Sequence, residues 1–66
     1  MKAVQINAKN PQRLVNALVA IRTRFVYEYG NIYLLGTDNV DKIKSFLERN
    51  EISTEDMFMN GIDYEF

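Results

Sequence analysis

The chain contains no cysteine and no histidine, and these two absences exclude several classes of site. Without thiolate or imidazole side chains, zinc, iron–sulfur and copper centres lack their usual ligands, and disulfide bonds cannot form. A hydrolase nucleophile needs a base to activate it, and the usual bases are missing for Ser45 and Ser53. We therefore expect no cofactor, no bound metal and no enzymatic activity.

Glycine and long apolar runs are also scarce. The three glycines are scattered at Gly30, Gly36 and Gly61, which excludes the glycine-rich loops that cradle phosphates in nucleotide-binding proteins. No apolar stretch approaches the roughly 20 residues that span a bilayer, and residues 1–7 lack the apolar region of a secretory signal. We expect a cytoplasmic protein with no membrane contact.

The 66 residues are expected to form one domain, 1–66, around a small core. Such a core supplies only roughly 3–5 kcal/mol of net stability, and disulfides and metals are excluded here. Self-association is the remaining way to stabilise such a small core, so we expect a homodimer. The net charge of −1 is uneven, because residues 1–24 carry +5 and residues 25–66 carry −6. This asymmetry indicates either a charged binding face or solvated surfaces whose charges cancel in the fold.

The first part of the chain predicts a strand followed by a helix. Residues 2–8 alternate between apolar and polar side chains, which is typical of a strand with one buried face. Asn10-Pro11 predicts the start of a helix that continues to about Thr23. Val15 and Val19 extend the apolar arc of this helix beyond what packing on one sheet needs. They are candidate partner contacts, unless the second helix buries them.

Residues 25–29 and 32–35 predict a β-hairpin around a Gly30-Asn31 turn. Both faces of this hairpin are substantially apolar, whereas a sheet covered by helices on one side should have a polar outer face. One row is expected in the core and consists of Phe25, Tyr27, Tyr29, Ile32 and Leu34. The other row is expected to form an exposed outer patch of Val26, Tyr33 and Leu35.

The remaining elements are a second helix, from a cap at Asp38 or Asn39 to near Asn50, and a last strand over residues 57–66. Asn60-Gly61 in that strand is either a bulge or a second hairpin turn. The order βαββαβ resembles the ferredoxin-like sandwich, an α+β fold in which two helices pack on one face of an antiparallel four-stranded sheet. A turn at Asn60-Gly61 would add a short fifth strand.

These features indicate a non-enzymatic protein-interaction module, a small regulator or inhibitor that self-associates or binds another protein through an apolar sheet face. Its size, acidity and lack of catalytic groups also fit a phage-encoded protein. No motif identifies the partner. The predicted protein interface consists of Val15, Val19, Val26, Tyr27, Tyr29, Tyr33 and Leu35.

The sequence is also compatible with two functions other than protein binding. A single-stranded nucleic-acid-binding domain would use Arg22 and Arg24 for phosphates and Tyr27 and Tyr33 for stacking on bases. The first strand offers no aromatic residue for such a surface, and the acidic second half of the chain would repel phosphates. A metabolite-sensing module would need a convergent polar pocket, which no sequence pattern reveals.

Overall fold

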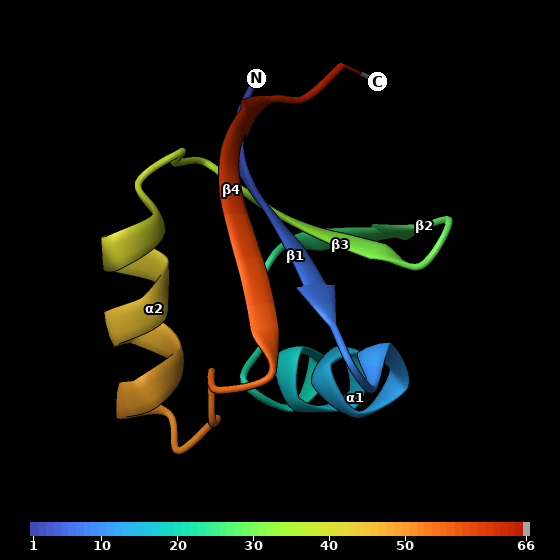
Figure 1. Ribbon diagram of the computed structural model, residues 1–66, viewed down its shortest axis with the longest axis vertical. Helices are drawn as coiled ribbons and strands as arrows, with labels where there is room; N and C mark the ends of the chain where they lie inside the picture. Colours follow the sequence, from blue (N-terminus) through green and yellow to red (C-terminus); the bar gives the residue numbers. More distant parts are fainter. Residues whose placement is uncertain (66) are drawn as a thin grey trace.

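Two helices pack against one face of a four-stranded sheet in the computed structural model, which describes residues 1–65 (Figure 1). The prediction of an α+β chain with an antiparallel four-stranded sheet and two helices is confirmed. None of the helices within residues 1–65 has the length and apolar character needed to cross a membrane. In chain order the elements are β1 Lys2–Ala8, α1 Pro11–Ala20, β2 Phe25–Glu28, β3 Asn31–Leu35, α2 Val40–Arg49 and β4 Met57–Asp63.

The strands lie in the order β2-β3-β1-β4, and every neighbouring pair is antiparallel. Since β1 lies between β3 and β4, its alternating side chains reach both faces of the sheet near its middle. Val4 and Ile6 are fully buried on the face that the helices cover. Gln5 and Asn7 lie on the opposite face, called the outer face below.

The core is one cluster between the inner sheet face and the two helices. Figure 1 shows α1 at the bottom of the view and α2 upright alongside β4, so the two helices run in different directions. Each helix contributes two leucine or isoleucine side chains to the cluster, and β1 and β3 contribute the rest. The buried members are Val4, Ile6, Leu14, Leu18, Ile32, Leu34, Ile43 and Leu47.

Helix α1 begins where the sequence predicts and ends earlier. The side chain of Asn10 accepts a hydrogen bond from the backbone N–H of Arg13 (3.3 Å), as an N-cap does. The helix ends at Ala20 instead of Thr23, because Arg22 adopts a left-handed conformation (φ 56°). The N–H of Thr23 then donates to the carbonyl of Leu18 (3.0 Å), which is the Schellman pattern. The prediction was too long because no glycine marks this end.

Helix α2 is capped by Asn39, one of the two expected residues, which accepts from the N–H of Lys42 (3.1 Å). Its predicted end near Asn50 is confirmed, since α2 stops at Arg49 and Asn50 is the C-cap. The left-handed residue is Glu51 (φ 62°), one position later. This places Ile52 where its N–H donates to the carbonyl of Leu47 (2.9 Å) and its side chain packs against the core, the apolar contact that accompanies this type of helix end.

The hairpin turn is one residue earlier than predicted. Glu28 pairs with Asn31, so the turn residues are Tyr29 and Gly30, and the predicted Gly30-Asn31 turn is wrong. Both turn residues have positive φ (50° and 77°), as a type I′ turn requires, and this turn favours glycine at its second position. Asn31 is thereby part of β3, where its side chain accepts a hydrogen bond from Nδ2 of Asn7 (2.8 Å).

Strand β4 is continuous through the segment that the sequence left ambiguous. Asn60 pairs with Gln5 and Gly61 with Val4, so Asn60-Gly61 forms neither a bulge nor a turn. Within residues 1–65 there is accordingly no fifth strand. The predicted strand over residues 57–66 is too long at its end, since β4 stops at Asp63. Phe66 lies outside the described residues.

Candidate functional site

The outer face is the sheet surface that neither helix covers. Cross-strand pairing places Gln5 between Tyr33 and Asn60, and Asn7 next to Phe58, so amide side chains form a band across its middle. Glu28 is the single charged residue among the strand residues of this face. From β2 to β4 these residues are Val26, Glu28, Asn31, Tyr33, Leu35, Ala3, Gln5, Asn7, Phe58, Asn60 and Ile62.

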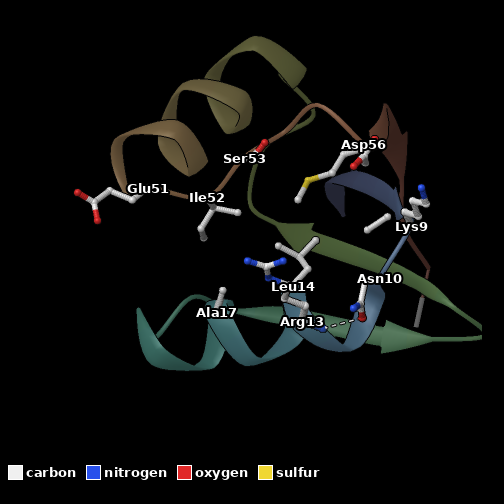
Figure 2. Close-up of a pocket in the computed structure, with 11 residues that line it drawn as sticks. Lys9, Asn10, Arg13, Leu14, Ala17, Glu51, Ile52, Ser53 and Asp56 are labelled. Carbon is white, nitrogen blue, oxygen red and sulfur yellow. Dashed lines mark hydrogen bonds between the residues drawn. The ribbon is translucent and has the colours of Figure 1, made fainter.

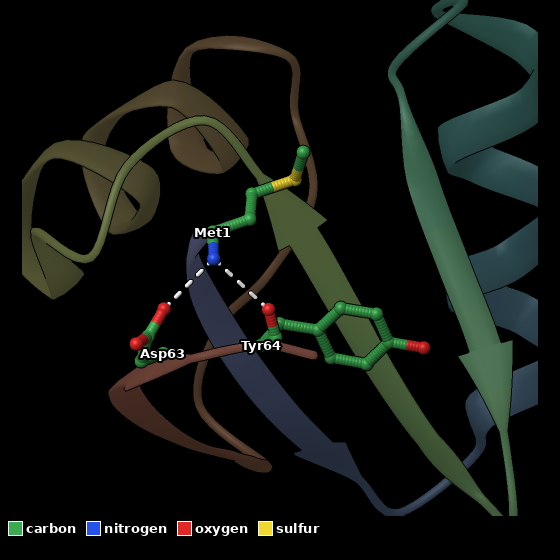
Figure 3. Close-up of polar contacts among 3 residues, drawn as sticks. All are labelled: Met1, Asp63 and Tyr64. Carbon is green, nitrogen blue, oxygen red and sulfur yellow. Dashed lines mark hydrogen bonds and ion pairs between the residues drawn. The ribbon is translucent and has the colours of Figure 1, made fainter. Parts of the chain in front are cut away.

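One corner of the outer face is covered by the chain's own Tyr64. Met1 and Tyr64 exchange backbone hydrogen bonds of 2.6 and 3.0 Å, which extend the pairing of β1 with β4 by one residue. The ring of Tyr64 then extends across the sheet toward β3 (Figure 3), with its centroid 4.7 Å from that of Tyr33. Ala3, on the same face, has an exposed fraction of 0%.

The Tyr64 ring reduces the exposure of the predicted outer patch. Val26, Tyr33 and Leu35 lie on the outer face, and each is half-buried. Their apolar surface is therefore partly used within the chain, at the corner where Tyr64 contacts Tyr33. The open part of the outer face lies toward the other end of the strands, where Asn7, Asn31 and Phe58 are found.

An exposed ion pair and the buried Tyr64 hydroxyl determine the electrostatics of this corner. The Met1 ammonium lies 2.8 Å from Oδ1 of Asp63 (Figure 3), and its hydrogen bond and positive charge lower the pKa of that carboxyl group. Burial raises the pKa of the Tyr64 hydroxyl, and the negative charge and hydrogen bond of Glu28 act in the same direction, as does Tyr33. The protonated hydroxyl is therefore the form that fits this corner.

Alkaline pH is expected to weaken the Tyr64 contact. The pKa of Tyr64 in the folded chain lies above its ordinary value of 10.0, so its contribution to stability is complete below pH 10.0 and is lost as the pH rises through the folded pKa. A Tyr64→Phe variant lacks the ionising hydroxyl. Its urea midpoint should fall less than that of the wild type between about pH 9 and about pH 11. Parallel falls in the two proteins would mean that Tyr64 is not buried against Glu28.

Two aromatic side chains are exposed near the open part of the outer face. Phe58 is 66% exposed, although it lies within β4. Tyr29 is 96% exposed at the hairpin tip, with a positive φ that asparagine or glycine adopts more readily. A bulky residue held in such a conformation is a feature that clusters at functional sites. Phe58 was missed in the sequence, although the alternation Phe58, Asn60, Ile62 places it on one face with Ile62.

The residues predicted as a protein interface do not form one surface. Tyr27 lies on the inner side of the sheet, since its neighbour across the hairpin is the core residue Ile32. Val15 packs against the core, whereas Val19 is 61% exposed on α1. Only Val26, Tyr33 and Leu35 share the outer face, and Tyr29 projects from its end.

The predicted nucleic-acid contacts are similarly divided. Tyr27 and Tyr33 lie on opposite faces of the hairpin. Arg22 and Arg24 are exposed in the connection between α1 and β2. A single strand of nucleic acid could not stack on both tyrosines along one face of the sheet.

A cleft of about 810 Å³ separates the first half of α1 from the segment between α2 and β4 (Figure 2). Lys9 and Arg13 line it from the basic part of the chain, and Glu51 and Asp56 from the acidic part. Among residues 1–65 the only ion pair within 4.0 Å is Met1–Asp63, so these four charges are not paired across the cleft. Leu14, Ala17, Ile52 and Met57 are among its apolar lining residues.

The cleft has an amphipathic lining. Its charged side chains are all exposed, and Figure 2 shows Glu51 directed away from the other lining residues. Ligand pockets usually bury most of the ligand and orient it with convergent polar groups. Within residues 1–65, no cluster of three acidic, cysteine or histidine side chains could hold a metal ion. The outer face is the stronger candidate site.

Comparison of this chain with protein-family models, with curated proteins and with solved structures finds no match. A function for the chain therefore has to rest on its own surfaces. The most informative are the amide band of the outer face and the exposed Phe58 beside it.

Proposed function

We propose that this chain is a non-enzymatic protein-interaction module, a small regulator or inhibitor, which binds another protein through the open part of its outer face. The observation that carries the proposal is Phe58, a large aromatic side chain that is 66% exposed within a regular strand. Aromatic residues are enriched at the centres of protein interfaces, where surrounding polar groups exclude water and set specificity. A cytoplasmic location and self-association are parts of the same proposal.

The charge of the outer face favours a protein over a nucleic acid as the partner. Nucleic-acid affinity depends largely on lysine and arginine side chains that neutralise phosphates. The strand residues of the outer face include Glu28 and no basic residue. The amides of Gln5, Asn7 and Asn60 can each donate and accept hydrogen bonds, which suits the polar groups of a protein surface.

For the architecture we propose the ferredoxin-like sandwich. The βαββαβ order of the elements supports this assignment, as does the central place of β1 between β3 and β4. The packing of both helices on one sheet face supports it as well. In this architecture the opposite sheet face is the surface left free for a partner.

Substitution of Phe58 tests the proposed interface. Partners would be captured from a lysate of the source organism with the wild-type protein, purified and titrated by calorimetry. Phe58→Ser is expected to weaken binding by at least about tenfold, because truncation of a central aromatic residue removes much of the contact energy. Val19→Ser is the matched control, since Val19 is similarly exposed but lies on α1. It should bind as the wild type does.

Equal affinities for the three proteins, or no partner beyond those captured by an unrelated bait, would contradict the assignment of the outer face. Single-stranded nucleic acid is the second candidate ligand, supported by the rings of Tyr33 and Phe58 on one face. A fluorescence titration with an oligonucleotide at low and high salt tests it. Tight binding that falls steeply with salt and is lost in Phe58→Ser would favour this candidate instead.

A further inference from the structure

Among residues 1–65, no strand pairs with the outer edge of β4, the edge that faces away from β1. Met1 and Tyr64 exchange both of their backbone hydrogen bonds. In an antiparallel pair such residues alternate with residues whose N–H and C=O groups point the other way. Counting back from Tyr64, the β4 residues that direct their N–H and C=O groups toward β1 are therefore Ile62, Asn60 and Phe58. The intervening residues then direct their N–H and C=O groups away from β1. The N–H of Met57 donates to the carbonyl of Thr54 (3.3 Å). Met59, Gly61 and Asp63 form the rest of this open edge.

The β2 edge of the sheet has the sequence features that usually prevent pairing, and β4 has few of them. Edge strands are usually kept from pairing with other chains by short length, charges, proline or bulges. Strand β2 has four residues and carries Glu28. Strand β4 has seven residues in unbroken register with β1, no proline, and Asp63 at its very end as its one charge. An edge of this kind favours the addition of another strand.

The sequence of β4 is complementary to itself in one antiparallel register. We propose that two copies of this chain pair through β4, related by a two-fold axis that passes beside Asn60. In this register Met59 forms a hydrogen-bonded pair with Gly61 of the second copy. Since the N–H of Met57 already donates to Thr54, Met57 contributes its carbonyl, which accepts from the N–H of Asp63 of the second copy.

The side chains match in the same register. On the outer face Phe58 lies opposite Ile62 of the second copy, and Asn60 lies opposite Asn60. On this face apolar residues therefore meet apolar residues, an amide meets an amide, and no like charges face each other. A shift by two residues in either direction would place Asn60 opposite Ile62 or Phe58 and leave outward groups unpaired.

The paired copies would form one sheet of eight strands with a continuous outer face. Part of the exposed surface of Phe58 would be covered by Ile62 of the second copy, and the amide bands of the two copies would meet at the axis. This inference rests on the proposed self-association and specifies its geometry. It also leaves the hairpin end of each outer face, with Tyr29, open to a different protein.

Charge substitutions at Asn60 test this geometry, because the two copies of residue 60 lie next to each other at the axis. Asn60 is exposed, so Asn60→Lys and Asn60→Glu should each fold normally, which their melting curves at low concentration would verify. Dimerisation would be followed by sedimentation equilibrium from about 1 μM to about 1 mM, the range of weak association. Asn16→Lys, at an exposed asparagine on α1, is the matched control.

The wild type and Asn16→Lys are expected to dimerise with the same dissociation constant. Each Asn60 variant alone should dimerise at least about tenfold more weakly, because like charges meet at the axis. An equal mixture of Asn60→Lys and Asn60→Glu should recover dimerisation as a one-to-one heterodimer. A wild type that stays monomeric, Asn60 variants that dimerise as the wild type does, or a mixture without recovery would each overturn the proposal.

The two proposals can fail separately. A monomeric wild type whose partner binding is still lost in Phe58→Ser would overturn the β4 dimer and leave the interaction module intact. A dimer that responds to the Asn60 charges as expected, in a protein that captures no partner, would support the β4 pairing and overturn the binding of a different protein.

Discussion

Leu18→Ala is expected to unfold a large fraction of the protein at room temperature. Leu18 is fully buried and anchors α1 in the core cluster. Truncation of a buried leucine to alanine costs about 2–5 kcal/mol, from lost burial and the cavity that remains. A core of this size supplies roughly 3–5 kcal/mol of net stability, so the loss is comparable with the whole. Urea denaturation followed by circular dichroism would measure it.

Val19→Ala is the control for this prediction, because Val19 is the next residue on α1 and is 61% exposed. Its unfolding free energy should stay within about 0.5 kcal/mol of the wild-type value. The contrast between the two variants tests which side of α1 packs on the sheet. Similar losses in both would mean that α1 does not direct Leu18 toward the sheet and Val19 toward solvent.

Gly61→Ala is expected to destabilise the protein by about 1–3 kcal/mol, the usual cost of overpacking. A Cβ at position 61 would overlap the backbone carbonyl oxygen of Asp38, in the connection between β3 and α2. Because the obstacle is backbone, no side chain can rotate away to relieve it. In a chain of this length each kcal/mol lowers the melting temperature by about 4–8 °C, which differential scanning calorimetry resolves readily.

The matched control for Gly61→Ala is Asn60→Ala, one residue earlier on the exposed outer face. At a concentration low enough to keep the protein monomeric, this variant should melt within about 2 °C of the wild type, as ordinary surface substitutions do. If Gly61→Ala also melted like the wild type, the connection between β3 and α2 would not pack against β4. Strand β4 would then lack this packing contact next to the edge proposed for pairing.

The sequence predicted the features of the fold that depend on neighbouring residues. The alternation over residues 2–8 and the N-cap at Asn10 both depend on local chemistry, and both are present in the structure. The hairpin turn was predicted one residue too late because Gly30 fits either turn, and the cross-strand partners therefore differ by two residues from those predicted. The Asn7–Asn31 hydrogen bond accompanies the observed register, and it joins residues 24 positions apart.

The candidate site depended more on contacts that are distant in sequence. The alternation of Ile62 with Asp63 indicated a strand, but the position of the Tyr64 ring depends on pairing with Met1 at the other end of the chain. This contact covers part of the patch that the hairpin sequence predicted to be open. The cleft likewise joins Lys9 and Arg13 to residues more than 35 positions away, so no local pattern predicts it.

Amide hydrogen exchange along β4 is the most direct test of the central claim, that this sheet is completed by another copy of the chain at its open edge. The N–H groups of Met59 and Gly61 point away from β1, and those of Asn60 and Ile62 point toward it. Exchange at Met59 and Gly61, measured by nuclear magnetic resonance, should slow as the protein is concentrated from about 1 μM to about 1 mM. Exchange at these two groups that stays fast at every concentration would contradict the claim.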